Sequence, residues 1–341
     1  MPNDFLRDYL SRLIRREHLS RDEAAQLLDG LLDEDATDAQ IAAALAALAA
    51  KGETIEELAG MASALRARAV RVNACHECFI DTAGTGSSPA KTFNISTAAA
   101  FVIAGAGLPV AKHGNRAASS RSGSADVMTA LGVNVSAAPQ ISERCLNEIG
   151  ICFMFAPLYH RATARVASVR RELGIHTTFN LLGPLSNPAG APRQIIGVWQ
   201  ADLVERLANV LAALGTKRAW VVHGEDGLDE ITLAGKTFVA EAQDGTVRTF
   251  AIEPQDFGLC RGALDHLRGG DAKANAHLIR EVLSATRGDE ARGLVVANAA
   301  AALFVGGVAD DLLEAAALAE KSIDSGAALM KLEQLVKVTN G

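Results

Sequence analysis

The first seventy residues place apolar side chains at helical spacing. Ser20 with Glu23, and Thr37 with Gln40, fit the capping box, in which a hydroxyl side chain and an acid or amide three positions later satisfy free amides at a helix start. An apolar stretch of helical periodicity follows each pair, and Thr54 is placed to cap a further helix. The pattern therefore predicts that this region is helical throughout.

From Phe79 onwards the pattern changes to short apolar runs bounded by Gly, Pro and Asn, which alternate with Ala-rich stretches of helical character. Strands interleaved with helices are typical of an α/β domain. The end of the chain, residues 294–341, is Ala-rich and helical by pattern. The candidate strands are residues 110–111, 151–155, 194–199, 219–222 and 238–241.

The length of the chain, 341 residues with 49% hydrophobic side chains, allows two domains and a sizeable core. Together with the change of pattern, it predicts an α/β fold class with a small second domain. We expect a mainly helical N-terminal domain over residues 1–72 and an α/β domain over residues 73–341.

The charge balance disfavours some partners. Thirty-three basic residues against 40 acidic ones give a net charge of −7, so we expect neither nucleic acid nor an anionic membrane as a partner, and any anion site must be local. The sequence has no apolar run as long as a membrane span, and the N-terminus begins as an amphipathic helix rather than a signal peptide. We therefore expect a cytoplasmic protein.

The five cysteines are an odd number spread along a long chain, which indicates reduced thiols rather than a disulfide framework. Cys75 and Cys78 form the one local pair, and they could be half of a zinc site or a redox pair. The sequence offers no second pair at zinc spacing, so two incidental thiols are the favoured interpretation.

Glycines, hydroxyls and cationic side chains are concentrated in residues 81–126, a composition that suits the binding of a phosphorylated substrate. Each motif also has a simpler explanation: the Gly-Thr-Gly at 84–86 could be any tight turn, the Asn-Ile-Ser-Thr at 94–97 a helix cap, and the basic segment 112–116 a solvated turn. A second hydroxyl-rich loop at 119–124 favours the functional interpretation, because two such loops suggest two phosphate groups.

Acidic and basic pairs further along the chain extend this chemistry. Asp229 and Glu230 follow an apolar strand, and adjacent carboxylates at a strand end can hold Mg²⁺, although an isolated pair is more often an acidic surface turn. Beside a diphosphate site, the metal is the favoured interpretation. Arg170 and Arg171 could bind a carboxylate in bidentate fashion, with one of the two remaining a surface charge.

Seven motifs occur in register along the chain. They are Asp-Thr-Ala-Gly-Thr-Gly at 81–86, Phe-Asn-Ile-Ser-Thr at 93–97, Lys-His-Gly-Asn-Arg at 112–116, Ser-Gly-Ser-Ala-Asp at 122–126, Val-Arg-Arg-Glu-Leu-Gly at 169–174, Phe-Asn-Leu-Leu-Gly-Pro-Leu-Ser-Asn-Pro at 179–188 and His-Gly-Glu-Asp-Gly-Leu-Asp-Glu at 223–230. In sequence, order and spacing they resemble the anthranilate phosphoribosyltransferase family, and the resemblance covers nearly the whole chain.

The resemblance implies a nucleoside-phosphorylase-like fold, that of the class IV phosphoribosyltransferases. In this fold a small all-helical domain is hinged to a large α/β domain with a central mixed sheet, and the active site lies in the cleft. It also implies a homodimer formed through the helical domain, which a segment near 170–190 would complete. The implied reaction transfers the phosphoribosyl group of 5-phosphoribosyl 1-diphosphate to the amine of anthranilate, with Mg²⁺ as cofactor, in tryptophan biosynthesis.

The same resemblance implies three groups of site residues. The diphosphate substrate would contact Gly84, Thr85, Gly86, Ser87, Ser88, Thr92, Asn94, Ser96, Thr97, Lys112, Asn115, Ser119, Ser120 and Ser124. Anthranilate would contact Gly84, His113, Asn115, His160, Arg170, Gly183 and Pro184, with Arg170 facing its carboxylate. The metal would be held by Ser96, Asp229 and Glu230. The neutral aromatic amine needs no protein nucleophile, so His113 is only a candidate for accepting a late proton.

Two positions depart from the family pattern. Where the family usually reads Gly-Thr-Gly-Gly-Asp-Gly, this chain reads Gly-Thr-Gly-Ser-Ser-Pro, so Ser88 replaces an acid and Pro89 stiffens the loop, which could change the demand for metal. Arg161 stands where the family commonly has proline and adds a cation near the expected entry of anthranilate.

Three alternatives remain open. A pyrimidine nucleoside phosphorylase shares the architecture, but its own phosphate motif is absent from this sequence. A diverged paralogue that acts on another aminobenzoate would keep the phosphoribosyl site and change the acceptor pocket. A non-catalytic nucleic-acid-binding relative would need a basic surface, which the net charge of −7 disfavours.

Overall fold

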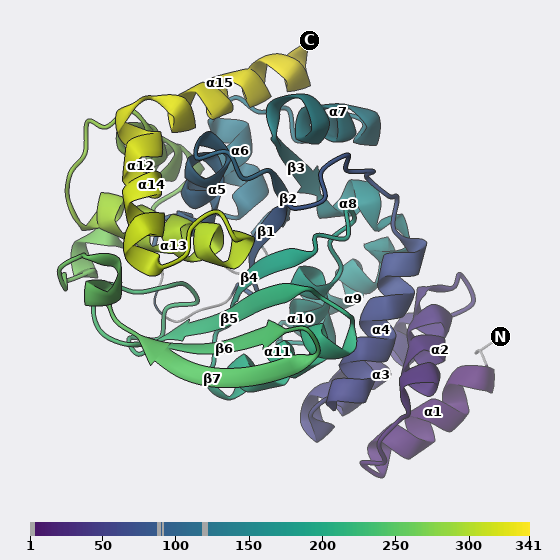
Figure 1. The fold of residues 1–341 in the computed structure, drawn as a ribbon. Coiled ribbons are helices and arrows are strands. Elements are labelled where there is room, and N and C mark those ends of the chain that lie inside the picture. The colour runs from purple at the N-terminus through teal and green to yellow at the C-terminus, as the bar shows by residue number, and fades with distance from the viewer. Residues whose placement is uncertain (1–3, 87–89, 91, 118–121) are drawn as a thin grey trace.

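The computed structural model describes residues 4–86, 90, 92–117 and 122–341, and the chain begins with a group of helices (Figure 1). The capping boxes predicted at Ser20 and Thr37 are confirmed, and Thr54 forms a third one with Glu57. The helices of this unit are α1 (Asp4–Ile14), α2 (Arg21–Leu32), α3 (Asp38–Lys51) and α4 (Ile55–Arg68).

One ion pair lies in the interior of this helical unit. The Lys51 ammonium lies 2.7 Å from the Glu57 carboxylate, and both side chains are almost fully buried. The same carboxylate accepts the backbone N–H groups of Leu19 and Thr54, at 2.9 and 2.8 Å. One buried charge therefore holds together the turn before α2 and the start of α4.

The rest of the chain is built on one seven-stranded sheet with the order β3-β2-β1-β4-β5-β6-β7. Strands β1 to β5 are parallel, and β6 and β7 add an antiparallel hairpin at one edge, so the expected mixed sheet of an α/β fold is confirmed. The strands are β1 (Ile80–Gly84), β2 (Val110–Gly114), β3 (Ile151–Phe155), β4 (Arg193–Gly197), β5 (Arg218–Gly224), β6 (Thr237–Gln243) and β7 (Thr246–Ile252).

The five predicted strands are present, the one at 151–155 with the predicted ends and the other four with shifted ends, and the structure adds β1 and β7. Strand β1 carries a single aliphatic residue of the β-forming type, Ile80, yet it lies in the centre of the sheet. Strand β7 is a largely exposed edge strand with polar side chains, so it shows little apolar pattern. The turn Asp244-Gly245, with φ of 50° and 79°, joins it to β6 as a two-residue hairpin.

Helices cover both faces of this sheet. Although α9 and α10 follow β3 in the chain, they pack against α3 and α4 of the helical unit. The helical end of the chain is confirmed in α13 to α15. The helices are α5 (Ile95–Gly105), α6 (Ser124–Ala130), α7 (Pro139–Ile149), α8 (Ala156–Tyr159), α9 (Ala164–Leu173), α10 (Thr178–Leu185), α11 (Asp202–Ala213), α12 (Ala272–Leu283), α13 (Glu290–Gly306), α14 (Leu312–Asp324) and α15 (Ala327–Asn340).

The sheet separates two cores, because successive side chains of a strand face opposite sides. Ile195 and Trp220 belong to a core shared with α5 and α13, whereas Ile196 and Val221 belong to one shared with the helical unit and α11. Figure 1 shows α12–α15 and α1–α4 well apart, with the sheet between them. The loops after β1, β2 and β5 follow the carboxyl ends of parallel strands. They therefore lie together along the side of the sheet that these strand ends form, called the sheet edge of the site below, where ligands bind in such folds.

Two further expectations concern membranes and thiols. Within the described residues, none of the helices has the length and apolar character needed to cross a bilayer. The five cysteines are all free thiols. The Cys78 sulfur lies 3.3 Å from the Gly306 carbonyl, which it contacts as a weak donor, and Cys75 is exposed.

Candidate active site

The loop after β1 lies against a carboxylate. The backbone N–H and the hydroxyl of Thr85 both donate to the carbonyl of Gly197 at the end of β4, at 2.9 and 3.2 Å. A Cβ on Gly84 would lie 3.5 Å from a carboxylate oxygen of Asp229. The Gly-Thr-Gly turn therefore brings exposed backbone next to Asp229, one of the three predicted metal ligands.

The start of α5, which contains the predicted ligand Ser96, faces Glu230, the third of these ligands. Asn94 occupies the N-cap position without capping the helix, and its Oδ1 instead accepts the Asn275 amide at 3.0 Å. The Ser96 backbone N–H donates to the Glu230 carboxylate at 3.1 Å. The first turn of this helix therefore has a backbone N–H directed at an acidic side chain, and a helix start of this kind favours acidic groups.

Lys112 is a buried cation rather than part of a solvated turn. Its ammonium donates to the Thr82 carbonyl and lies 3.3 Å from the Ser96 hydroxyl oxygen. Burial lowers the pKa of Lys112, and the carboxylates of Asp81 and Glu230 oppose that effect. The positive charge of Lys112 therefore lies next to the first turn of α5.

Asp229 and Glu230 form a half-buried acidic pair. Burial, and then the charge of Asp229, raise the pKa of Glu230 to about 8. A carboxylate whose charge is disfavoured in this way is stabilised by a cation, and carboxylate and hydroxyl oxygens are the ligands that Mg²⁺ prefers. Since Ser96 and Glu230 also line one small cavity, the predicted metal ligands fit a magnesium site.

The acidic loop is held by groups that our sequence analysis did not single out. A Cβ on Gly197 would lie 1.6 Å from the Asp229 carbonyl oxygen, so the loop can approach β4 only because this residue is glycine. Asn298 of α13 accepts the N–H of Ile231 at 3.0 Å and donates to its carbonyl at 2.9 Å.

His113 and His160 are buried, with ring centroids 5.2 Å apart. His113 Nδ1 lies 3.2 Å from the Gly183 carbonyl, which can only accept, so Nδ1 carries the proton and Nε2 the lone pair. Among the described residues Nε2 has no hydrogen-bond partner. Burial lowers the pKa of His113 to about 3 and that of His160 to about 4, so both rings are neutral at pH 7.

Two buried polar residues connect this part of the site. Asp81 accepts the His113 backbone N–H at 3.1 Å and the Asn187 amide at 2.7 Å. Asn187 also donates to the Ala111 carbonyl at 2.8 Å. Burial raises the pKa of Asp81 to about 6. Our sequence analysis included Asp81 and Asn187 in two motifs but gave them no role of their own. The one available sign of a special role was the charged side chain of Asp81 directly after the apolar residues Phe79 and Ile80.

Arg170, in the last turn of α9, is half-buried and faces α10. Its Nη2 donates to Asn180 Oδ1 at 3.1 Å, and its guanidinium carbon lies 5.6 Å from the Phe179 ring centroid. The Nε is buried without a hydrogen-bond partner among the described residues. Arg171 is exposed, so the structure separates an inward-facing cation from a surface charge.

The remaining predicted site residues differ in how far they are buried and in what they contact. Asn115 is exposed, and its carbonyl accepts the Ser124 hydroxyl at 3.3 Å. The Thr97 side chain is fully buried, and the Thr92 hydroxyl donates to the Phe93 carbonyl at 3.2 Å. Pro184 is buried in α10, and Arg161 is exposed. The residues that lie outside the described part of the chain are Ser87, Ser88, Pro89, Ser119 and Ser120.

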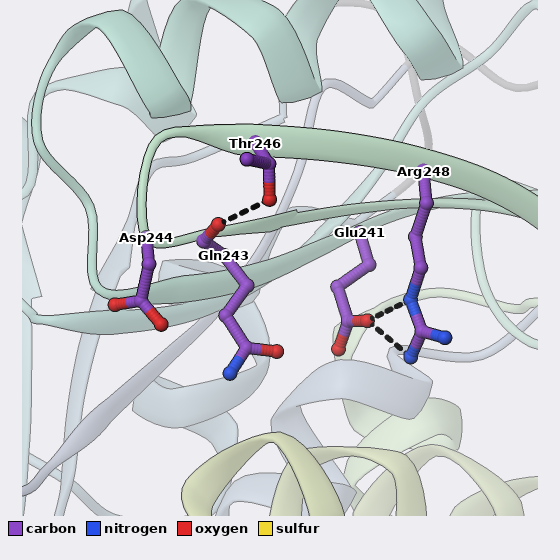
Figure 2. Close-up of a pocket in the computed structure, with 5 residues that line it drawn as sticks. All are labelled: Glu241, Gln243, Asp244, Thr246 and Arg248. Atoms are coloured by element: carbon purple, nitrogen blue, oxygen red, sulfur yellow. Dashed lines mark hydrogen bonds and ion pairs between the residues drawn. The ribbon is translucent and has the colours of Figure 1, made fainter.

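A separate pocket on the β6–β7 hairpin is not part of this site (Figure 2). The Glu241 carboxylate there is already satisfied by Arg218, Arg248 and Trp220, at 2.7, 2.6 and 3.0 Å. Gln243 pairs with the first residue of β5, so the pocket lies at the amino end of the parallel strands, opposite the catalytic motifs. Its lining residues are Glu241, Gln243, Asp244, Thr246 and Arg248.

Comparison with known families agrees with this architecture. The family model described as the α/β domain of the glycosyl transferase family matches residues 76–329, and the one described as the helical bundle domain of that family matches residues 7–69. A helical bundle followed by this α/β domain places the chain in the glycosyl transferase family.

Individual relatives show which family of glycosyl transferases the chain resembles. A protein of Anaeromyxobacter dehalogenans named anthranilate phosphoribosyltransferase is 56% identical over 330 residues, 97% of each chain. The crystal structure of anthranilate phosphoribosyltransferase from Thermus thermophilus is similar with a TM-score of 0.93 and 39% identity, covering 98% of this chain and 100% of that one. The chain belongs to the anthranilate phosphoribosyltransferase family.

A third relative has been solved with ligands. The Saccharomyces cerevisiae enzyme in complex with PRPP and Mg is similar with a TM-score of 0.90 and 28% identity, covering 99% of this chain and 98% of that one. The same yeast enzyme in complex with 4-fluoroanthranilate gives a TM-score of 0.87 at 28% identity, covering 98% and 97%.

Proposed function

We propose that this protein transfers the 5-phosphoribosyl group of 5-phosphoribosyl 1-diphosphate to the amine of anthranilate, giving N-(5-phosphoribosyl)anthranilate and pyrophosphate in tryptophan biosynthesis. The observation that carries the proposal is a continuous series of contacts at one sheet edge. It joins the acidic pair to Ser96 and Lys112, and from the neighbouring His113 it continues to α10 and Arg170. The proposed diphosphate site and the proposed carboxylate site would therefore be joined by contacts between protein groups.

The diphosphate end of the site suits the departure of pyrophosphate. As the bond to ribose C1 breaks, negative charge grows on the leaving group, and the start of α5 with the Lys112 ammonium would stabilise it. The oxygens of Ser96, Asp229 and Glu230 would hold Mg²⁺, which supplies further charge neutralisation when bound. The yeast relative solved with PRPP and Mg supports this assignment.

The acceptor end of the site suits a neutral aromatic amine with a carboxylate. Arg170 would bind the carboxylate, which positions the amine lone pair for attack on ribose C1. When the C–N bond has formed, the nitrogen is positively charged and must lose a proton. His113 Nε2 carries a lone pair and no hydrogen, so it would accept that proton and pass it to water.

The larger organisation is part of the proposal. Residues 1–72, completed by the segment 170–190, would act as one domain, and residues 73–341 as the catalytic one. The packing of α9 and α10 against the helical unit supports this division. We further propose a homodimer through the helical domain, supported by the exposed apolar side chains of Phe5 and Ile14 on α1. The free thiols are in keeping with a cytoplasmic location.

A diverged paralogue acting on another aminobenzoate is the competing function. It would explain the exposed Arg161 and the Ser-Ser-Pro sequence at 87–89, the two departures from the family pattern. The 56% identity to a relative named for anthranilate favours the main proposal.

The loss of anthranilate fluorescence with 5-phosphoribosyl 1-diphosphate, at a series of Mg²⁺ concentrations, tests the proposed reaction. We expect Asp229→Ala to lower kcat/KM by about a hundredfold or more, because charge on the leaving group loses its stabilisation. Arg170→Ala should raise the KM for anthranilate by about tenfold or more, since a charged hydrogen bond is lost.

Two exposed neighbours serve as controls. Glu225 lies in the same loop as Asp229, and Arg171 follows Arg170, so Glu225→Ala and Arg171→Ala should both keep activity close to wild type. Folded protein that consumes no anthranilate at any Mg²⁺ concentration would refute the proposed reaction and direct the search to other aromatic amines.

A further inference from the structure

We propose that Asn180 positions Arg170 and sets its specificity, because its neutral amide oxygen fixes the guanidinium while leaving the positive charge available for the carboxylate of the acceptor. The inference rests on the proposed function, since it concerns the same acceptor site. It adds a reason why an amide, rather than an acid, stands beside the arginine.

Arg170 is held in place without being neutralised. Asn180 Oδ1 accepts its Nη2 at 3.1 Å, and the Phe179 ring lies under the guanidinium. Arg170 forms no ion pair with any carboxylate in the described part of the chain, and its Nε is buried without a partner there. Arg218 of the sheet differs, because its Nε lies 2.7 Å from the Glu241 carboxylate. The charge of Arg170 is therefore free to meet a ligand.

A second hydrogen bond, from the backbone of α10's cap, fixes the position of the Asn180 side-chain oxygen. It also accepts the backbone N–H of Thr177 at 3.0 Å, which anchors it at the start of α10. The next residue, Thr178, donates its hydroxyl to Glu53 of the helical unit at 2.5 Å. One turn further along α10, the Gly183 carbonyl is the partner of His113. One helix thus orients both polar groups of the acceptor site.

The amide at position 180 is not what local stability alone would select. Asn180 is the third residue of α10, where a side-chain acid interacts well with the helix dipole and can accept the same N–H of the cap. An aspartate has the same shape and could accept both hydrogen bonds. It would also form an ion pair with Arg170 and repel a second carboxylate, so the neutral side chain is explained by the ligand rather than by the fold.

Three variants separate positioning from charge. Asn180→Asp keeps both hydrogen bonds and adds a negative charge, and Asn180→Ala removes the oxygen without adding charge. Asn209→Asp is the matched control, because it adds the same charge on α11, where the amide donates to the Glu205 carbonyl at 2.8 Å. For each variant, calorimetry gives the Kd of anthranilate and of benzoate, kinetics give kcat and both KM values, and thermal unfolding reports folding.

We expect Asn180→Asp to raise the Kd and KM for anthranilate by about tenfold or more, and Asn180→Ala to raise them by less. The KM for 5-phosphoribosyl 1-diphosphate and the kcat at saturating anthranilate should stay within about twofold. Turnover of aniline, which has no carboxylate, should not distinguish Asn180→Asp from wild type. A change confined to carboxylate-bearing ligands is an effect that a merely structural role would not produce.

The outcomes are distinct. An anthranilate Kd in Asn180→Asp close to that of wild type would overturn the inference, and an equal effect of Asn180→Ala would overturn its charge component. If wild type binds benzoate, Asn180→Asp weakens that binding and no turnover occurs, the proposed reaction fails while the role of Asn180 stands. If wild type binds neither anthranilate nor benzoate, the role of Asn180 fails as well.

Discussion

Individual side chains in this site carry charges that the protein leaves partly unbalanced. Glu230 has a pKa raised to about 8, so at pH 7 it is largely protonated until a cation arrives. A cation held by Asp229 and Glu230 would displace that proton. Arg170 is the opposite case, a cation without an acid beside it among the described residues. Each charge is complementary to one part of the proposed substrates.

The two buried histidines predict how stability depends on pH. The pKa of His113 is lowered to about 3 and that of His160 to about 4, against an ordinary value of about 6.5. Below pH 6.5 these two rings take up protons in the unfolded chain but not in the folded protein, so their contribution to the free energy of unfolding should fall as the pH is lowered. Each ring should contribute about 1.4 kcal/mol per pH unit between roughly pH 6 and pH 4.

Chemical unfolding of wild type and His160→Gln across this range checks the prediction. The buried Asp81 and Glu230 act in the opposite direction, because their pKa values are raised to about 6 and about 8 and their folded forms gain a proton first. The difference between the two proteins removes their contribution, and the variant should show the shallower fall. His277→Gln, at an exposed position, is the control and should follow wild type. Parallel curves for wild type and His160→Gln would contradict the assignment.

Among the structural elements, the end of β4 determines where the acidic loop lies. A side chain at Gly197 would meet the Asp229 carbonyl at 1.6 Å, so Gly197→Ala must displace the loop or the strand. Misplacing catalytic groups by about 1 Å can cost about a hundredfold in rate, and we expect a loss of kcat/KM of that order with a raised demand for Mg²⁺.

Gly288→Ala provides the comparison for this variant. A Cβ there would meet no atom within 4 Å, so its activity and metal demand should match wild type. A Gly197→Ala enzyme with wild-type kcat/KM at low Mg²⁺ would show that the approach of the loop to β4 is not needed for metal binding.

The elements also show how much of the fold and of the candidate site could be predicted from the sequence. Capping residues and apolar periodicity predicted the helical unit and five strands, because those signals are local. The motifs predicted Lys112, His113 and Arg170 as functional, and the structure places all three at or beside one sheet edge. The roles of Gly197, Asn180 and Asn187 could not be predicted, because each depends on which segment lies opposite after folding. All the predicted contacts with substrates and metal stay predictions, and Ser87, Ser88, Ser119 and Ser120 lie outside the described part of the chain.

On the scale of the whole molecule, the helical unit and the elements of the proposed acceptor site share one core. The core that contains α1 to α4 also contains residues of α9, α10 and α11 and one face of β4 to β6. Arg66 of α4 donates to the Leu185 carbonyl at the end of α10 at 2.6 Å. Loosening the helical unit should therefore disturb binding of anthranilate more than binding of the diphosphate substrate.

Glu57→Gln tests this connection. It leaves the Lys51 ammonium, 1% exposed, without its carboxylate, and breaking a buried pair in this way typically costs about 3–5 kcal/mol. We expect a loss of unfolding free energy of that size, with a KM for anthranilate that rises more than the KM for 5-phosphoribosyl 1-diphosphate. Adding Lys51→Met should recover part of the loss. A Glu57→Gln protein within about 1 kcal/mol of wild type would show that the pair is not needed.

The β6–β7 hairpin has a practical consequence for the intact enzyme. It ends in the tight Asp244-Gly245 turn, beside Asp244 and Thr246 in Figure 2. The turn lies at the edge of the sheet and next to the start of β5, at the end opposite the loops after β1, β2 and β5. The chain leaves the body of the protein there and returns at almost the same point, so a reporter domain or an attachment peptide could be spliced between these two residues. Such a handle would let the enzyme be immobilised with its catalytic edge facing the solution.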